Sequence, residues 1–272
     1  MKTLSYRLMP YIRRFTHRYN VYAAMALATF LLSTTAQAGI AIGLTRVVVT
    51  GGDKSGSVQI LNKGNHPALL QLWVDNNITE MDKSIEQIKV PFVVETPVFR
   101  LDPQTNKSVR IYYTGTASQL PPDRESMFWL NVLEVPPKSA SSQAANNQAA
   151  NNEVQIAFRS RIKLFYRPAG IPASSEGVLN QLSFGWIPQG SGGIFRVTNP
   201  TPFNVTFQTL EIAQSKSATR TTVKLGNDDM VAPKSSTDGV LVGNQVPAKN
   251  MTVFFSIIDD FGSTIEGQQS LQ

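Results

Sequence analysis

The sequence contains no cysteine among its 272 residues. A disulfide, a zinc–thiolate site and a cysteine nucleophile are therefore excluded, and the folded state must be stabilised by burial of apolar side chains. Histidine is almost absent as well, since His66 is the one histidine beyond residue 38. It lies in a turn between Asn65 and Pro67, which is typical of a surface histidine. The sequence therefore gives little support for chemistry that depends on a histidine base or ligand.

Other catalytic patterns are also missing. The sequence has no glycine-rich phosphate loop, no paired-histidine helix motif and no calcium-loop pattern. Acidic pairs occur at three places: Asp123/Glu125, Asp228/Asp229 and Asp259/Asp260. Neighbouring carboxylates in loops usually solvate the chain or pair with arginine, although a secreted hydrolase using one of the pairs stays an alternative. We expect no enzymatic activity, no catalytic residue, no metal and no cofactor.

Long apolar runs are absent except near the start of the chain. Residues 1–38 combine five basic residues, an apolar run at 21–32 and the small-residue ending Ala36-Gln37-Ala38. The run is shorter than the roughly 20 apolar residues that a membrane helix needs. The pattern predicts a cleaved signal peptide with a mature start at Gly39, and no membrane insertion after cleavage. An uncleaved amphipathic anchor is the alternative.

The excess of positive charge belongs mostly to this leader. Five of the 25 lysines and arginines lie in residues 1–38, so 20 remain against 19 acidic residues. A nucleic-acid-binding domain needs a basic face on the folded domain itself. A nearly neutral mature chain gives no support for such a partner, and we expect none.

The remaining residues, 272 less 38 or 234 in all, suffice for two domains. Short β-rich runs separated by Gly, Asn and Pro predict strands at 42–49, 57–61, 69–74, 92–94, 108–113, 127–135 and 154–166. After a proline-rich hinge at 168–172, a second set is expected at 179–186, 193–198, 204–212, 221–225, 239–242 and 251–258. We therefore expect an all-β protein of two antiparallel sandwich domains, 39–167 and 168–272, with few and short helices.

The strand at 154–166 carries the most information. Its alternate positions divide into two faces: Val154, Ile156, Phe158, Ser160, Ile162 and Leu164 on one, and Gln155, Ala157, Arg159, Arg161 and Lys163 on the other. It follows a stretch, 139–152, whose Ser, Gln, Ala and Asn content predicts a mobile loop rather than a short alanine-rich helix. In one interpretation the apolar row points into the protein's own core and the basic face is solvated. In the other, the strand is an edge whose exposed apolar row serves a partner.

Five segments resemble the periplasmic chaperones of the chaperone-usher pilus-assembly pathway: "RVVVTGGDKSGSVQILNKGNHPALLQLWVD", "DRESMFWLNVLEVPP", "IAFRSRIKLFYRP", "VTNPTPF" and "IDDFG". The resemblance implies two immunoglobulin-like β-sandwich domains in an L or boomerang shape, with a subunit-binding cleft between them. The segment 138–153 is longer than in short-loop members. Because long-loop members usually carry a cysteine pair, we place the chain in the short-loop group, with an insertion, serving rod-like pili.

The resemblance also implies roles for particular residues. Val154, Ile156 and Phe158 would be the side chains of a strand donated to a pilus subunit that lacks its own final strand. Arg46 and Lys163 would bind the carboxylate at the subunit's C-terminus. A third set, Glu125, Arg167 and Asp260, would form an ion network between the domains and hold the interdomain angle.

The implied function is that of a periplasmic chaperone that binds, folds and caps pilus subunits and delivers them to an outer-membrane usher without ATP. The free chaperone is expected to self-associate through its exposed strand. A structural pilus subunit or adhesin is the alternative from another class. The complete strand ending in Lys-Leu-Phe-Tyr-Arg-Pro argues against it, because such a subunit lacks a final strand.

Overall fold

The computed structural model describes residues 39–76, 84–116, 119–135, 156–190, 192–243, 247 and 250–272. The predicted signal peptide, the predicted loop at 139–152 and Val154 all lie outside these ranges. The described residues form seventeen strands and three single-turn 3₁₀ helices: η2 (Ile85–Gln87), η3 (Val178–Asn180) and η4 (Asn227–Asp229). The all-β prediction is confirmed. Within the described part of the chain, no helix has the length and apolar character needed to cross a membrane.

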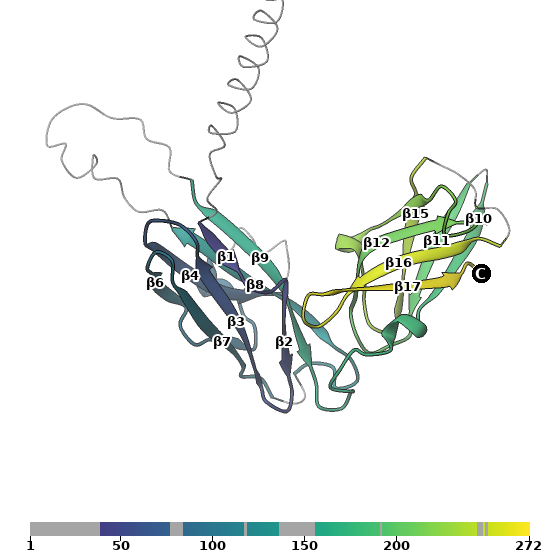
Figure 1. Cartoon of the computed structure of the whole chain (residues 1–272). Helices are drawn as coiled ribbons and strands as arrows, with labels where there is room; N and C mark the ends of the chain where they lie inside the picture. Colours follow the sequence, from purple (N-terminus) through teal and green to yellow (C-terminus); the bar gives the residue numbers. More distant parts are fainter. Residues whose placement is uncertain are drawn as a thin grey trace, which may run out of the picture. The chain divides into compact units, whose positions relative to one another are not determined.

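The first nine strands form two sheets that pack against each other (Figure 1). They are β1 (Ile40–Ile42), β2 (Arg46–Thr50), β3 (Ser55–Asn62), β4 (Ala68–Asp75), β5 (Phe92–Val94), β6 (Val98–Leu101), β7 (Asn106–Tyr113), β8 (Ser126–Val135) and β9 (Phe158–Arg167). One sheet has the order β1-β3-β7-β5 and the other β2-β9-β8-β4-β6. Alternate residues of both sheets face a common core. Its fully buried members include Val49, Ile60, Leu70, Ile111 and Leu130.

The prediction of one strand over residues 42–49 is wrong, because the chain forms two strands there. β1 pairs with β3 in one sheet, and β2 pairs with β9 in the other. The transition lies at Gly43, whose N–H donates to the carbonyl of Gln59 at 2.8 Å. The β2–β9 pair is parallel, whereas the sequence predicted an antiparallel sandwich throughout. The parallel pair arises because the chain leaves the first sheet after β1 and joins the second sheet as β2, next to β9.

The remaining strands form a second β-rich body with its own core (Figure 1). They are β10 (Ser183–Gln189), β11 (Gly192–Asn199), β12 (Val205–Ala213), β13 (Thr221–Leu225), β14 (Met230–Val231), β15 (Ser235–Leu241), β16 (Thr252–Ile258) and β17 (Thr264–Ser270). They join in the order β10-β11-β15-β13-β12-β16-β17, with β14 beside β12. The core is rich in phenylalanine, and the rings of Phe184 and Phe255 lie 4.8 Å apart.

Three strands were not predicted from the sequence: β6, β14 and β17. The sequence of β17, TIEGQQS, shows little apolar alternation, and most of its residues are exposed at the edge of the sheet. Its pairing with β16 runs over seven residues. Main-chain hydrogen bonding to a buried neighbour therefore produces a strand here that side-chain patterning does not reveal.

Candidate functional site: a cation pair beside an exposed strand

Arg46 and Lys163 lie side by side because β2 and β9 pair in parallel with these two residues in register. Arg46 is 4% exposed, and its guanidinium donates to the carbonyl of Ile258 at 2.9 Å. The ammonium group of Lys163 donates to the hydroxyl of Thr206 at 3.3 Å. Both acceptors belong to the second β-rich body, on β16 and β12. The two cations therefore converge where the two bodies contact each other.

The charges of this pair are poorly compensated. Burial lowers the pKa of Lys163, and the positive charge of Arg46 lowers it further, although Asp228 and Asp229 oppose the shift. Burial also lowers the pKa of Arg46, although the charges of Asp260, Asp259 and Glu125 oppose the shift without pairing directly with Arg46. Its buried Nε has no hydrogen-bond partner. Among the described residues, neither cation forms a salt bridge, so the site favours an incoming anion with two oxygen atoms.

The first half of β9 is an open edge next to this pair. β8 pairs with β9 from Phe158 to Tyr166, whereas β2 pairs only with Lys163 to Arg167. Along residues 158–162, no other described strand covers the second edge. Phe158, the first residue of β9, is 65% exposed, and Ile156, two residues before the strand begins, is 63% exposed. Unpaired main-chain groups with an exposed apolar row are the features that another β-strand can add to.

Glu125, Arg167 and Asp260 are brought together by the structure. The guanidinium of Arg167 donates to Oε1 of Glu125 at 2.7 and 2.9 Å and to both carboxylate oxygens of Asp260 at 2.8 Å. The second oxygen of Glu125 accepts from the main-chain N–H of Asn204 at 2.8 Å. The network therefore links the end of β9 to the loops before β12 and after β16. Sequence reasoning did not include Asn204, although it lies next to the Asn-Pro-Thr-Pro motif.

Burial and hydrogen bonding act differently on the two carboxylates. Burial raises the pKa of Glu125, against the opposing charge of Arg167. Burial alone would raise the pKa of Asp260 too, but the hydrogen bonds and charge of Arg167 outweigh it, and the pKa is lowered. Asp260 is therefore the well-compensated partner, whereas for Glu125 the cost of burying the charge exceeds the compensation by Arg167 and Asn204.

The interpretation of the other face of β9 as a solvated basic face is wrong. Arg159 and Arg161 both donate to the carboxylate of Asp75, at 3.1 and 2.6 Å. Asp75 is fully buried. The sequence offered no signal for it, because an aspartate at the end of a strand is usually exposed.

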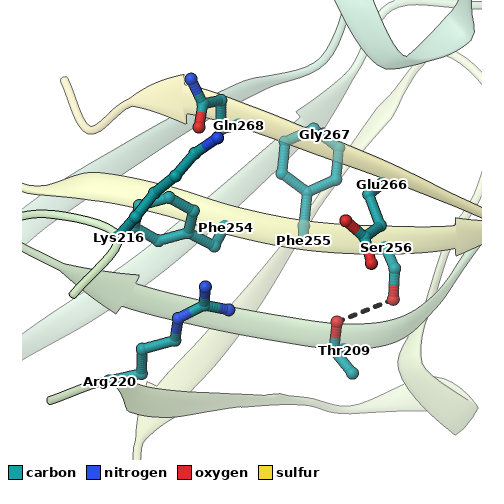
Figure 2. A pocket seen from close by; sticks show the side chains of 9 residues that line it. All are labelled: Thr209, Lys216, Arg220, Phe254, Phe255, Ser256, Glu266, Gly267 and Gln268. Atoms are coloured by element: carbon teal, nitrogen blue, oxygen red, sulfur yellow. Dashed lines mark hydrogen bonds between the residues drawn. The ribbon is translucent and has the colours of Figure 1, made fainter. Parts of the chain in front are cut away.

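A separate pocket of about 440 Å³ lies on the second β-rich body and contains none of the predicted site residues. Figure 2 shows Arg220 and Lys216 among the side chains that line it, and the hydrogen bond between Thr209 and Ser256. Arg220 already pairs with Glu211 at 2.9 Å and stacks over Phe254 at 4.6 Å. Because this cation is compensated, the pocket is a weaker candidate for a binding site than the Arg46–Lys163 pair.

Comparisons with known proteins agree with the geometry. Residues 39–172 match the model of the pili and flagellar-assembly chaperone, PapD N-terminal domain, and residues 178–269 match that of the pili assembly chaperone PapD, C-terminal domain. The chain is 38% identical to the probable fimbrial chaperone YadV of Escherichia coli over 88% of this chain and 92% of that protein. It is 35% identical to the chaperone protein FimB/FhaD of Bordetella pertussis over 95% and 98%.

A solved structure gives the same result. The crystal structure of the YadV chaperone superimposes with a TM-score of 0.68 at 37% identity, covering 86% of this chain and all of that one. Both halves of the described chain thus match the two domain models of one family, and whole-length relatives carry the name of fimbrial chaperone. The chain belongs to the family of PapD-like pilus-assembly chaperones, as the resemblance of its motifs predicted.

Proposed function

We propose that this protein is a periplasmic chaperone that binds, folds and caps pilus subunits by lending them a β-strand, and then delivers them to an outer-membrane usher. The observation that carries the proposal is the open edge of β9, where Phe158 and the preceding Ile156 are exposed beside a cation pair that has no carboxylate partner within the described ranges. A subunit whose sandwich lacks one strand would supply both a strand partner for the open edge and a carboxylate for the cation pair. Its sheet would pair with the open edge, and its terminal carboxylate would enter the cation pair.

The apolar row would provide affinity. Burial of a large apolar side chain stabilises a complex by about 1.5 to 3 kcal/mol before ordering costs. Ile156 and Phe158 expose most of their surface in the free protein, so this energy is still available for binding. By the alternation of the strand, Val154 would be the third donated side chain, and main-chain hydrogen bonds would fix the direction of pairing.

The cation pair would fix the register of the bound subunit. A carboxylate between Arg46 and Lys163 would relieve the repulsion that lowers the pKa of Lys163 and would give Nε of Arg46 a partner. Hydrogen bonds to charged groups contribute about 1.5 to 3 kcal/mol each. Since the chain terminus would be held at one point, the subunit residues opposite Phe158 and Ile156 would be determined by their distance from it.

Export would precede this activity. We propose that residues 1–38 are removed in the periplasm, so that the mature protein begins at Gly39. The two domains would then be 39–167 and 168–272, joined at the proline-rich hinge. The Glu125–Arg167–Asp260 network would hold the angle between them, and thereby the position of the cation pair relative to the open edge.

Lys163→Ala tests the function and the anchor together. The mature protein would be tagged, recovered from the periplasm of a strain that expresses its own pilus subunits, and examined by intact-mass measurement with whatever co-purifies. We expect a stoichiometric β-rich subunit to co-purify with the wild type. With Lys163→Ala, the amount of co-purified subunit should fall by about tenfold or more, because one charged hydrogen bond is removed.

The matched control is Lys224→Ala, which removes an exposed lysine from β13. It should retain the subunit at the wild-type level. Equal recovery with Lys163→Ala would contradict the carboxylate anchor but leave the chaperone function in place. No co-purifying subunit with any variant would contradict the proposed function itself.

The open edge also predicts self-association of the free protein. Two copies that pair their exposed β9 strands would bury the apolar rows that each exposes alone. Light scattering should therefore show a concentration-dependent dimer, and Phe158→Asp should shift the population to monomer. Monomers alone at millimolar concentration would rule this contact out.

A further inference from the structure

The outer surface of the β9-β8-β4 sheet carries a compact group of side chains that we call the arginine clamp: Arg159 and Arg161 from β9, Asn131 and Trp129 from β8, and Asp75 and Trp73 from β4. The carboxylate of Asp75 at its centre is fully buried and accepts three hydrogen bonds. These come from Nη2 of Arg159 at 3.1 Å, Nη2 of Arg161 at 2.6 Å and Nδ2 of Asn131 at 2.8 Å.

The other contacts of the clamp tie β9 across two neighbouring strands. Nε of Arg159 donates to Oδ1 of Asn131 at 2.9 Å. The guanidinium of Arg159 lies 4.7 Å from the ring of Trp73, and that of Arg161 lies 4.7 Å from the ring of Trp129. The arginine side chains are only 21% and 12% exposed. This burial, together with the shared buried carboxylate, distinguishes the clamp from an ordinary surface ion pair.

The clamp acts on the half of β9 that has the least other support. Residues 163–166 lie between β2 and β8, and their inner side chains Leu164 and Tyr166 belong to the core. In residues 158–162, by contrast, β8 is the only described neighbouring strand, and Phe158 projects into solvent. Ile162 packs against the core from this half of β9. The hydrogen bonds of Arg159 and Arg161 to Asp75 are its polar side-chain contacts with β4.

The clamp is also specific for one register. Arg161 pairs directly with Asn131, and Asn131 with Trp73, so the arginines reach the carboxylate diagonally from fixed positions. A slip of one residue would turn both arginines to the opposite face. A slip of two residues in one direction would bring Ala157 to the place of Arg159 and leave the buried carboxylate with one cation fewer. A slip of two in the other direction would replace Arg161 by Lys163 beside Asp75 and remove Lys163 from its position next to Arg46. A slip of one residue, or of two in the first direction, leaves a buried charge poorly compensated, which is costly.

We propose that the arginine clamp is a positioning device that holds the open half of β9 extended and in register before a subunit arrives. This inference deepens the proposed function and rests on it for its biological role. Ordering a strand on binding reduces affinity, so a strand ordered in advance binds more tightly. Arg159, Arg161 and Asp75 are in this view positioning residues that need not touch the subunit.

The test is amide hydrogen exchange of the free mature protein, compared for wild type, Arg159→Gln and Asp75→Asn. We expect the amides of residues 158–162 that bond to β8 to exchange about tenfold faster in Arg159→Gln, and faster still in Asp75→Asn, because local opening becomes easier. The amides of residues 163–167 and of the second β-rich body should stay within about twofold of wild type. Affinity for the subunit that co-purifies with the wild type should fall by about tenfold in Arg159→Gln.

Arg196→Gln is the matched control, because it breaks a bidentate arginine–carboxylate pair, with Asp238, on the exposed surface of the second body. It should alter neither exchange at 158–162 nor affinity. If exchange at 158–162 is unchanged in Arg159→Gln, the proposal is overturned. Uniformly faster exchange in both bodies would also overturn it, since that is general destabilisation. Because exchange is measured without a subunit, this result stands even if no subunit co-purifies and the proposed function fails.

Discussion

Replacing Ile156 and Phe158 together by serine is expected to abolish subunit capture and to leave the stability of the free protein unchanged. Both side chains are more than 60% exposed, so neither contributes appreciably to the protein's own core. Their burial against a subunit would be worth about 3 to 6 kcal/mol in total, or roughly a hundredfold to ten-thousandfold in affinity. Subunit co-purification and urea unfolding of the same preparations measure the two effects separately.

The control for this pair lies in the same β-rich body. Val93 and Val98 are each 52% exposed, on β5 and β6, and serine at both positions removes a comparable apolar surface away from β9. That variant should capture the subunit as the wild type does. A double variant at 156 and 158 that still co-purifies with a stoichiometric subunit would show that the donated strand does not supply the affinity.

Arg167→Ala is expected to cause the largest loss of stability. The side chain is 3% exposed, and its removal leaves the buried carboxylate of Glu125 without a cation. Breaking a buried ion pair by removing one partner costs about 3 to 5 kcal/mol. Arg167 also stacks over Phe203 at 4.8 Å, so packing is lost as well. Urea unfolding of the mature protein measures the change. Arg196→Ala, which breaks an exposed pair, should cost about 1 kcal/mol or less.

The loss of stability in Arg167→Ala should depend on pH, because Glu125 and Asp260 both titrate. In the wild type, the lowered pKa of Asp260 means that its contribution is present above its unfolded pKa and is lost as the pH falls through the folded pKa. The raised pKa of Glu125 means that its ionised form costs stability above that pKa, and that protonation relieves the cost. Without Arg167 this cost grows. The deficit of Arg167→Ala should therefore narrow as the pH falls, and a constant deficit would contradict the assignment of a charged Glu125.

A scattering experiment separates stability from geometry. If the Glu125–Arg167–Asp260 network holds the angle between the domains, Arg167→Ala should broaden the distribution of interdomain distances in small-angle scattering under conditions where both domains remain folded. Subunit affinity should then fall even at low temperature. If Arg167→Ala lowers stability but leaves the distribution of interdomain distances narrow, the network stabilises the fold without holding the interdomain angle.

Family membership explains the absences in the sequence. Members of this family are assembly chaperones, so the chain is not an enzyme, and the lack of a catalytic histidine, metal motif and phosphate loop agrees with a protein that works by strand pairing. Asp123 and Glu125, considered for a hydrolase, instead bond to Lys234 and Arg167. The alternative of a structural pilus subunit is set aside by the same membership.

Sequence alone determined the fold class, the family and the face of each residue on β9. Because side chains alternate along a strand, the sequence defines which of them share a face, independently of the strands that pair with it. The combined motifs are specific enough to indicate the family. These properties are local, or nearly so, and therefore readable along the chain.

The family resemblance already grouped Arg46 with Lys163, and Glu125 with Arg167 and Asp260, but only the tertiary structure decided the register and burial through which these charges meet, and it alone placed Asp75 among them. It divided the predicted first strand at Gly43 and thereby placed Arg46 parallel to β9, in register with Lys163. It also buried Asp75, from a different strand, between Arg159 and Arg161, so that a face expected to be solvated became a clamp. Pairing register and burial depend on contacts between residues far apart in sequence, and the energy of a charge depends on what surrounds it. The alternation of β9 specifies that its arginines point outward, and the fold supplies the carboxylate that holds them.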